Sequence, residues 1–367
     1  MVFFYRVTSF LGLLDYRRLS VKVGSSMVWM FGAVGMFAEQ YGYSGVLLYL
    51  AILSISRALF TELSTSITSR FAIGVTSYQY APVAIIAVGM LAIVAPDSDL
   101  ALHAIPVLIA LFVAAFFPFY YEIYYLKGVS VESLQATEAT GTAISAVLTA
   151  FVTLVSGSIW MTVVLGSAIV ILSFFIEIGV SDDELLEYQY SLKEEAANRS
   201  KRDILRGVLI VASVSSITYC STTDLRLHLF ADPDSAVMGV VVLALTVAVA
   251  EVSACLVVRK HSFDSPLMRR WGFVITCTGF GLMFSDLPWH LLFGYVAVTT
   301  VSRAINRASD YSEGRKALKG VGNRVALREI TRYRAMALLT PLLWVPSILP
   351  LVGLVAALVL ILVPFES

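Results

Sequence analysis

The sequence predicts an all-α integral membrane protein with about twelve transmembrane helices in two six-helix bundles. Three observations support this fold class: the composition, the apolar runs and the distribution of positive charge. Of the 367 residues, 58% are hydrophobic and 14% are charged, whereas an average soluble domain has about 25% charged residues. A soluble chain needs a polar surface that this composition does not supply. With a formal net charge of +0, the protein has no overall positive charge that would attract nucleic acid, so we expect no nucleic-acid partner.

The apolar runs have the length of membrane spans, because a bilayer core of about 30 Å needs about 20 residues of helix. Asp286 with Pro288, and Pro346 with Pro350, interrupt two of the longest runs and divide each into two spans. The runs are solidly apolar, unlike transmembrane β-strands, which alternate apolar and polar residues. The twelve candidate spans are 23–42, 44–63, 80–96, 103–126, 137–156, 158–179, 207–224, 236–258, 270–285, 287–305, 333–347 and 349–365.

The positive charges predict the orientation of these spans, since Lys and Arg gather in cytoplasmic loops. With the N-terminus inside, all 26 Lys and Arg residues except Arg226 fall on the cytoplasmic side. Acidic residues such as Asp97, Asp99 and Asp232 fall in the predicted outer loops. One miscounted helix early in the chain would invert this pattern. We therefore expect a multi-pass protein of the plasma membrane with both termini in the cytoplasm.

The loop lengths predict the domain organisation. Residues 1–22 are expected to form an N-terminal cytoplasmic amphipathic segment on the inner membrane surface. Residues 23–179 form the N-terminal six-helix bundle, 180–206 a cytoplasmic linker that starts acidic and ends basic, and 207–367 the C-terminal six-helix bundle. A second long inner loop, 303–332, is rich in cations and predicts an electrostatic anchor on the inner leaflet.

Six plus six helices, a central cytoplasmic linker and internal termini resemble the major facilitator superfamily (MFS). Inner loops of that family after helices two and eight usually carry the pattern G-x-x-x-D-R-x-G-R-R. The first loop here, TELSTSITSRFAIG, keeps Glu62 and Arg70 of this pattern. The second, VVRKHSFDSPLMRRWGF, is a closer match and keeps Arg259, Lys260, Asp264, Arg269 and Arg270. The resemblance implies a secondary transporter in which helices 1, 4, 7 and 10 line the pathway and the two halves rock around it.

Ionisable residues within the spans are the candidates for substrate or ion binding, because burying one in the bilayer costs several kcal/mol. Glu39 lies near the outer end of the first span, where solvation at the headgroups is the alternative interpretation. Glu122 and Tyr121 lie in FFPFYYEIYYLKG, where a carboxylate among tyrosines can hold a proton or cation; an interfacial aromatic belt is the alternative. Asp224 and His290 lie near the outer mouth.

Arg57, Glu138 and Glu251 are the candidates for an inner gate. Arg57 and Glu251 lie at similar depths in helices two and eight, which occupy equivalent places in the two halves. Snorkelling of the long Arg57 side chain is an alternative for that residue. Because helices five and eight adjoin in the family, Glu138 is a possible partner of Glu251.

Motifs for catalysis are absent from the sequence. It contains no Walker loop, GxSxG or HExxH pattern, so we expect no enzyme activity, no catalytic residues and no cofactor. The scattered Asp224, His228, Asp286 and His290 lack a spacing typical of metal ligands, and no metal site is predicted.

The predicted function is therefore alternating-access transport of a small solute by a monomer, coupled to a proton or ion through intramembrane carboxylates. Few cations lie deep in the spans, which favours neutral, cationic or amphipathic solutes over a multiply charged anion. Two alternatives remain. A non-transporting scaffold or subunit would use the 303–332 loop as its docking surface. An intramembrane lipid-modifying enzyme would need acids or histidines clustered at one membrane face.

Overall fold

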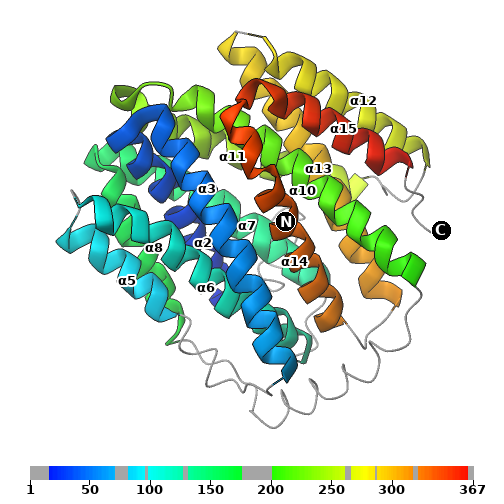
Figure 1. Ribbon diagram of the computed structural model, residues 1–367, viewed down its shortest axis with the longest axis horizontal. Coiled ribbons are helices and arrows are strands. Elements are labelled where there is room, and N and C mark those ends of the chain that lie inside the picture. The colour runs from blue at the N-terminus through cyan, green and yellow to red at the C-terminus, as the bar shows by residue number, and fades with distance from the viewer. Residues whose placement is uncertain are drawn as a thin grey trace, which may run out of the picture.

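The helices of this protein pack side by side, and most of them are inclined in the same direction in the view of Figure 1. The computed structural model describes residues 16–70, 82–95, 98–126, 131–175, 201–260, 266–285, 287–316 and 321–362. These residues are helical apart from short connections, and none of them lies in a β-strand. The predicted all-α class is confirmed for this part of the chain.

The helical elements follow the predicted apolar runs closely. The first group comprises α2 (Tyr16–Ser26), the π-helix η1 (Met27–Gly32), α3 (Ala33–Arg70), α5 (Pro82–Val94), α6 (Asp99–Leu126), α7 (Val131–Ser156) and α8 (Ile159–Ser173). The second group comprises α10 (Lys201–Leu229), the 3₁₀ turn η2 (Pro233–Ser235), α11 (Ala236–Lys260), α12 (Pro266–Met283), α13 (Pro288–Lys316), α14 (Val321–Leu339), the 3₁₀ turns η3 (Thr340–Trp344) and η4 (Pro346–Ile348), and α15 (Leu349–Leu362). The predicted breaks at Pro288 and at Pro346 coincide with element boundaries.

A sharp turn at Gly42 divides α3 into the end of the first predicted span and the whole of the second. Gly42 has φ 57° and ψ −139° inside the continuous helix assignment, a conformation that glycine adopts without the steric penalty of a side chain. A Cβ atom at this position would also lie 3.0 Å from the ring of Pro233 in η2. The turn therefore packs against the connection between α10 and α11.

The length and apolarity of the helices support an integral membrane protein. Four described stretches are long and apolar enough to cross a bilayer: Tyr16–Leu63, Ala136–Ser156, Val208–Leu229 and Pro233–Val257. Shorter apolar helices are Val83–Val94, Asp99–Ala114, Ile159–Ser173 and Pro346–Leu360. Large apolar side chains such as Phe151, Leu172 and Phe293 are exposed on the bundle, as expected for a surface that contacts lipid.

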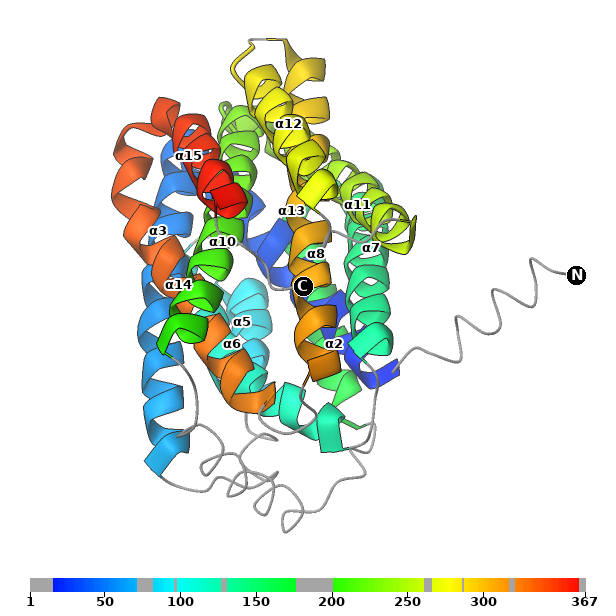
Figure 2. The same cartoon turned by 90° about the vertical axis from the view of Figure 1, so that its right-hand side faces the viewer.

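Helix packing separates into contacts within each group and contacts between the groups. In the first group α2 packs on α7 and α8, and α6 packs on α3 and α5; in the second, α10 packs on α13, α14 and α15. The groups meet where α3 contacts α14 and where α7 contacts α11, at opposite sides of the view in Figure 2. Two long helix pairs therefore join the two groups.

Glycine allows the closest helix approach within the first group. A Cβ atom on Gly24 in α2 would lie 2.4 Å from the carbonyl oxygen of Gly166 in α8, a distance that real side chains do not tolerate. Small residues at such crossings let helix backbones pack directly in membrane proteins. The position of η1 beside α8 follows from this contact.

The helix bounds bear on three of the predicted segments. Residues 16–22 belong to α2 inside the bundle rather than to a surface helix, and Arg18 is only 1% exposed. An ion partner on α7, described below, offsets the cost of burying this charge. The predicted inner loop 303–332 is helical where it is described, because α13 continues to Lys316 and α14 begins at Val321. Helix α10 begins at Lys201, within the predicted linker, of which residues 180–200 lie outside the described part.

Candidate functional site

The π-helical turn η1 accepts hydrogen bonds from two side chains that are distant in sequence. The hydroxyl of Tyr49 donates to the carbonyl oxygen of Trp29 at 2.5 Å, and Nη2 of Arg226 donates to the carbonyl oxygen of Met30 at 3.1 Å. A π-turn changes the regular backbone hydrogen bonding of a helix and is frequent at functional sites. Side chains from α3 and α10 thus stabilise an irregular segment within the first span.

Arg226 is a buried cation with unused donors. The residue is 5% exposed, and its Nε atom has no hydrogen-bond partner among the described residues. An arginine carries five N–H donors, of which the contact with Met30 uses one. Burying a charge without an ionic partner carries a cost of several kcal/mol. Tyr49, Tyr219 and Tyr295 lie within electrostatic range of the guanidinium, and so does Arg57.

Arg57 packs against aromatic rings in the same region. Its guanidinium lies 4.3 Å from the centroid of the Trp29 ring and 5.6 Å from that of Tyr333. Both distances are within the range of a cation–π interaction, which stabilises a desolvated cation by about 2 kcal/mol. Arg57 is buried, so the predicted alternative of snorkelling to the inner surface does not describe it.

These residues form what we call the arginine–tyrosine cluster. Its members come from η1, α3, α10, α13 and α14, and so from both helix groups. A hydrogen bond of 2.6 Å between the hydroxyls of Thr218 and Ser302 also joins α10 to α13. The cluster consists of Trp29, Met30, Tyr49, Arg57, Tyr219, Arg226, Tyr295 and Tyr333.

A second set of charges, which we call the inner ion pairs, lies nearer the predicted cytoplasmic ends of the helices. Arg18 Nη2 lies 2.8 Å from Oε1 of Glu138, and Lys22 Nζ lies 3.5 Å from Oε2 of the same carboxylate. These contacts join α2 to α7. Lys22 also lies within electrostatic range of Arg303 on α13 and Arg332 on α14, which places this set at the boundary of the two helix groups.

Glu251 forms the other inner ion pair. It is 2% exposed on α11 and contacts the guanidinium of Arg303 on α13. Glu138 pairs with Arg18 and Lys22 of α2, and Glu251 pairs with Arg303, so each carboxylate has a cation beside it. The partnership of Glu138 with Glu251 stays a prediction.

The coupling candidates occupy different environments. Asp224 is 5% exposed, its Oδ1 lies 3.9 Å from Nδ1 of His228, and its Oδ2 has no hydrogen-bond partner among the described residues. Glu39 is exposed at the end of the first span. His290 contacts the hydroxyl of Ser285 at 2.9 Å. Tyr121 and Glu122 lie in α6, but their side chains lie outside the described part of the chain.

The structure gives no support for a metal site in the part it describes. No group of three His, Cys, Asp or Glu residues there could hold a metal ion. Asp286, one of the four scattered residues considered from the sequence, lies outside the described residues.

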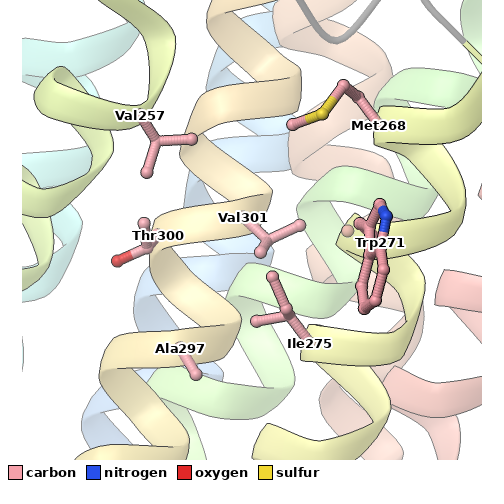
Figure 3. A pocket seen from close by; sticks show the side chains of 8 residues that line it. Val257, Met268, Trp271, Ile275, Ala297, Thr300 and Val301 are labelled. Atoms are coloured by element: carbon pink, nitrogen blue, oxygen red, sulfur yellow. The ribbon is translucent and has the colours of Figure 1, made fainter. Parts of the chain in front are cut away.

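An apolar cavity of about 410 Å³ lies between α11, α12 and α13 (Figure 3). Its lining includes Val257, Met268, Trp271, Ile275 and Thr300, and contains no charged side chain. Trp271 is 56% exposed, so the cavity opens at the periphery of the bundle. An apolar cavity at this position suits a lipid chain and supplies no group for ion coupling.

Sequence reasoning missed the arginine–tyrosine cluster except for Arg57. It placed Arg226 in an outer loop, whereas α10 continues to Leu229 and holds this residue inside the bundle. One signal was present: Arg226 is the single cation that the predicted topology leaves on the outer side. A cation that departs from the charge rule needs an internal partner, which here is the Met30 carbonyl.

Comparison with known proteins supports the fold. No protein-family model matches the chain, and no curated protein matches it in sequence. Among solved structures, nucleoside transporter NupG superposes with a TM-score of 0.59 at 13% identity, covering 96% of this chain and 98% of that chain. A bacterial homologue of the iron transporter ferroportin gives 0.58 at 16% identity, covering 95% and 96%. The E. coli fucose:proton symporter FucP gives 0.57 at 10% identity, covering 98% and 99%.

These matched proteins are transporters rather than enzymes, and each is covered over nearly its whole length. At such low identity the likeness shows the fold. The predicted resemblance to the MFS is thereby confirmed at the level of fold.

Proposed function

We propose that this protein is a secondary active transporter that moves a small solute across the membrane by alternating access. The arginine–tyrosine cluster is the observation that carries the proposal. It joins η1 and α3 of the first helix group to α10, α13 and α14 of the second, around buried polar groups that packing alone does not require. In transporters of this kind, solute sites lie near the bilayer midplane where the two repeats meet.

The transport proposal includes a topology. It has twelve spans, bundles at 23–179 and 207–367, a linker at 180–206 and cytoplasmic termini, and the distribution of Lys and Arg supports this arrangement. The first span then starts at about Tyr16, with its charged turn held by Glu138. We place the protein in the plasma membrane as a monomer.

The inner ion pairs are the proposed cytoplasmic gate. The ion pair of Glu138 joins α2 to α7, and that of Glu251 joins α11 to α13. Lys22 is repelled by Arg303 and Arg332, which belong to the other helix group. Rocking of the groups changes the distance between these like charges. The electrostatic repulsion energy between these charges therefore depends on the relative position of the two helix groups.

Proton coupling is proposed to involve an intramembrane carboxylate, as a proton-driven mechanism requires. Asp224 has the best structural support, because it is buried, has an oxygen without a described partner, and lies beside His228. Glu122 and Glu39 remain candidates from the sequence. A membrane potential of 100 mV provides about 2.3 kcal/mol for each charge moved, which is enough to accumulate a solute substantially.

Reconstituted vesicles that contain a trapped pH-sensitive dye test this proposal. Addition of a panel of anionic, neutral and cationic solutes is expected to acidify or alkalinise the lumen for at least one of them. Glu39→Gln, Glu122→Gln and Asp224→Asn are the test variants, and Glu62→Gln, at an exposed pair with Arg334, is the control. Loss of the signal in at least one test variant supports coupling; a scaffold would tolerate all three changes.

A further inference from the structure

We propose that the transported solute carries a carboxylate and that Arg226 binds it within the arginine–tyrosine cluster. This inference rests on the proposed transport function and names its substrate class. It differs from the sequence-based preference for neutral, cationic or amphipathic solutes, which rested on the small number of cations deep in the predicted spans.

The geometry of Arg226 leaves one edge of the guanidinium for a ligand. Nη2 is hydrogen-bonded to the Met30 carbonyl, while the Nε atom is buried without a partner among the described residues. A carboxylate binds arginine best through two parallel hydrogen bonds, and the edge that includes Nε offers two adjacent donors. That edge is formed by Nε and Nη2; Nη2 carries two N–H bonds, so one can donate to the Met30 carbonyl while the other, with Nε–H, remains for a carboxylate.

The charges around Arg226 also favour the binding of an anion. No described carboxylate lies within ion-pair distance of it, and Arg57 is a second buried cation within electrostatic range. Asp224 is two residues away on α10, so it projects from a different side of the helix, where it lies beside His228. A bound carboxylate would offset both the lost hydration and the repulsion between the two guanidinium groups.

The neighbouring side chains favour an organic acid over an inorganic anion. Tyr49, Tyr219 and Tyr295 are buried around the cation, and their rings provide apolar surface with a polar edge. The charged group of the solute would bind Arg226 while its body packs against these rings. A carboxylate with a small apolar or aromatic body has this chemistry.

Binding to the full-length protein in detergent tests the assignment. The probes are acetate, lactate, benzoate and phenylacetate at up to millimolar concentrations, each with its primary amide, plus benzylamine as a cation. We expect at least one carboxylate to raise the unfolding temperature of the wild type, with its amide about tenfold weaker or inactive. If no carboxylate binds, or if amides and benzylamine bind as well as the acids, the inference is overturned.

Variants at Arg226 locate the site. Arg226→Ala should abolish the effect, and Arg226→Lys, which keeps the charge but not the two-pronged donor edge, should weaken it about tenfold. Arg334→Ala is the matched control, because Arg334 is an exposed arginine paired with Glu62. Should Arg226→Ala fail to fold in gel filtration, the Lys variant decides: unchanged affinity for the carboxylate would overturn the inference.

Flux measurements distinguish failure of this inference from failure of the proposed function. If a carboxylate binds to the protein but does not move into the vesicles, the anion site is supported and the transport proposal is contradicted. Flux of a neutral or cationic solute that is unaffected by Arg226→Lys would sustain transport and remove the anion site.

Discussion

Nη2 of Arg226 donates a hydrogen bond of 3.1 Å to the carbonyl oxygen of Met30. This bond joins α10 to the π-helical turn of the first span, across the boundary between the two helix groups. A contact of this kind couples the shape of one helix to the position of the other.

The hydroxyl of Tyr49 is expected to stabilise the π-turn. Tyr49→Phe removes the hydrogen bond from its hydroxyl to the Trp29 carbonyl, and a hydrogen bond of this kind contributes about 0.5–1.5 kcal/mol to stability. Thermal unfolding in detergent should show a lower unfolding temperature. Tyr16→Phe, at an exposed tyrosine of α2, is the control and should change nothing. Equal behaviour of the two variants would contradict the role given to this bond.

Glu251 is expected to be essential for the packing of α11 on α13. Glu251→Gln leaves Arg303 without its buried carboxylate, and breaking a buried ion pair costs about 3–5 kcal/mol. The control is Glu62→Gln, whose exposed pair with Arg334 contributes less than about 1 kcal/mol. Denaturant unfolding in mixed micelles measures both. A loss for Glu251→Gln no larger than for the control would refute the buried pair.

A double variant separates lost charge pairing from lost packing at the same site. Replacing both members, as in Glu251→Gln with Arg303→Met, removes the uncompensated charge and should recover part of the stability lost by the single variant. No recovery in the double variant would mean that the effect of Glu251 comes from other contacts.

The crossing of α2 and α8 is expected to tolerate no side chain at Gly24. Gly24→Ala places a Cβ atom 2.4 Å from the Gly166 carbonyl oxygen, so the backbones must separate, at a cost of about 1–3 kcal/mol. Gly281→Ala on α12 is the matched control, since nothing lies within 4 Å of its added Cβ. There the higher helix propensity of alanine should be neutral or stabilising. The elution profile of each variant and its unfolding temperature measure the difference.

The sequence predicted the helices because their apolar runs determine them. The predicted span 236–258 lies within α11 (Ala236–Lys260), and Pro288 begins α13 as expected. The errors fall where polar residues belong to helices. Helix α10 starts at Lys201, before the predicted span 207–224, and α13 continues to Lys316, beyond the predicted span 287–305. Hydropathy measures affinity for lipid, so it does not detect the polar residues at which a helix continues beyond its apolar run.

A residue of the candidate site could be predicted only where its own position in the sequence shows that it needs a partner. Glu251 was selected because a carboxylate deep in a span needs a partner, and it has one in Arg303. The partner of Arg18, by contrast, lies 120 residues away at Glu138, and nothing local indicates that pairing. The π-turn is likewise not evident in MVWMFG, and the side chains that donate hydrogen bonds to it, Tyr49 and Arg226, lie 20 and 196 residues from their acceptors in the sequence.

Uptake of a radiolabelled solute into vesicles that contain the purified protein tests the central claim most directly. The solute is the carboxylate of the panel that binds best. We expect saturable uptake that is accelerated by unlabelled solute inside the vesicles, is lost in Arg226→Ala and is retained in Arg334→Ala. Uptake no faster than in protein-free vesicles, for this carboxylate and for every other solute of the panel, would contradict the assignment as a transporter.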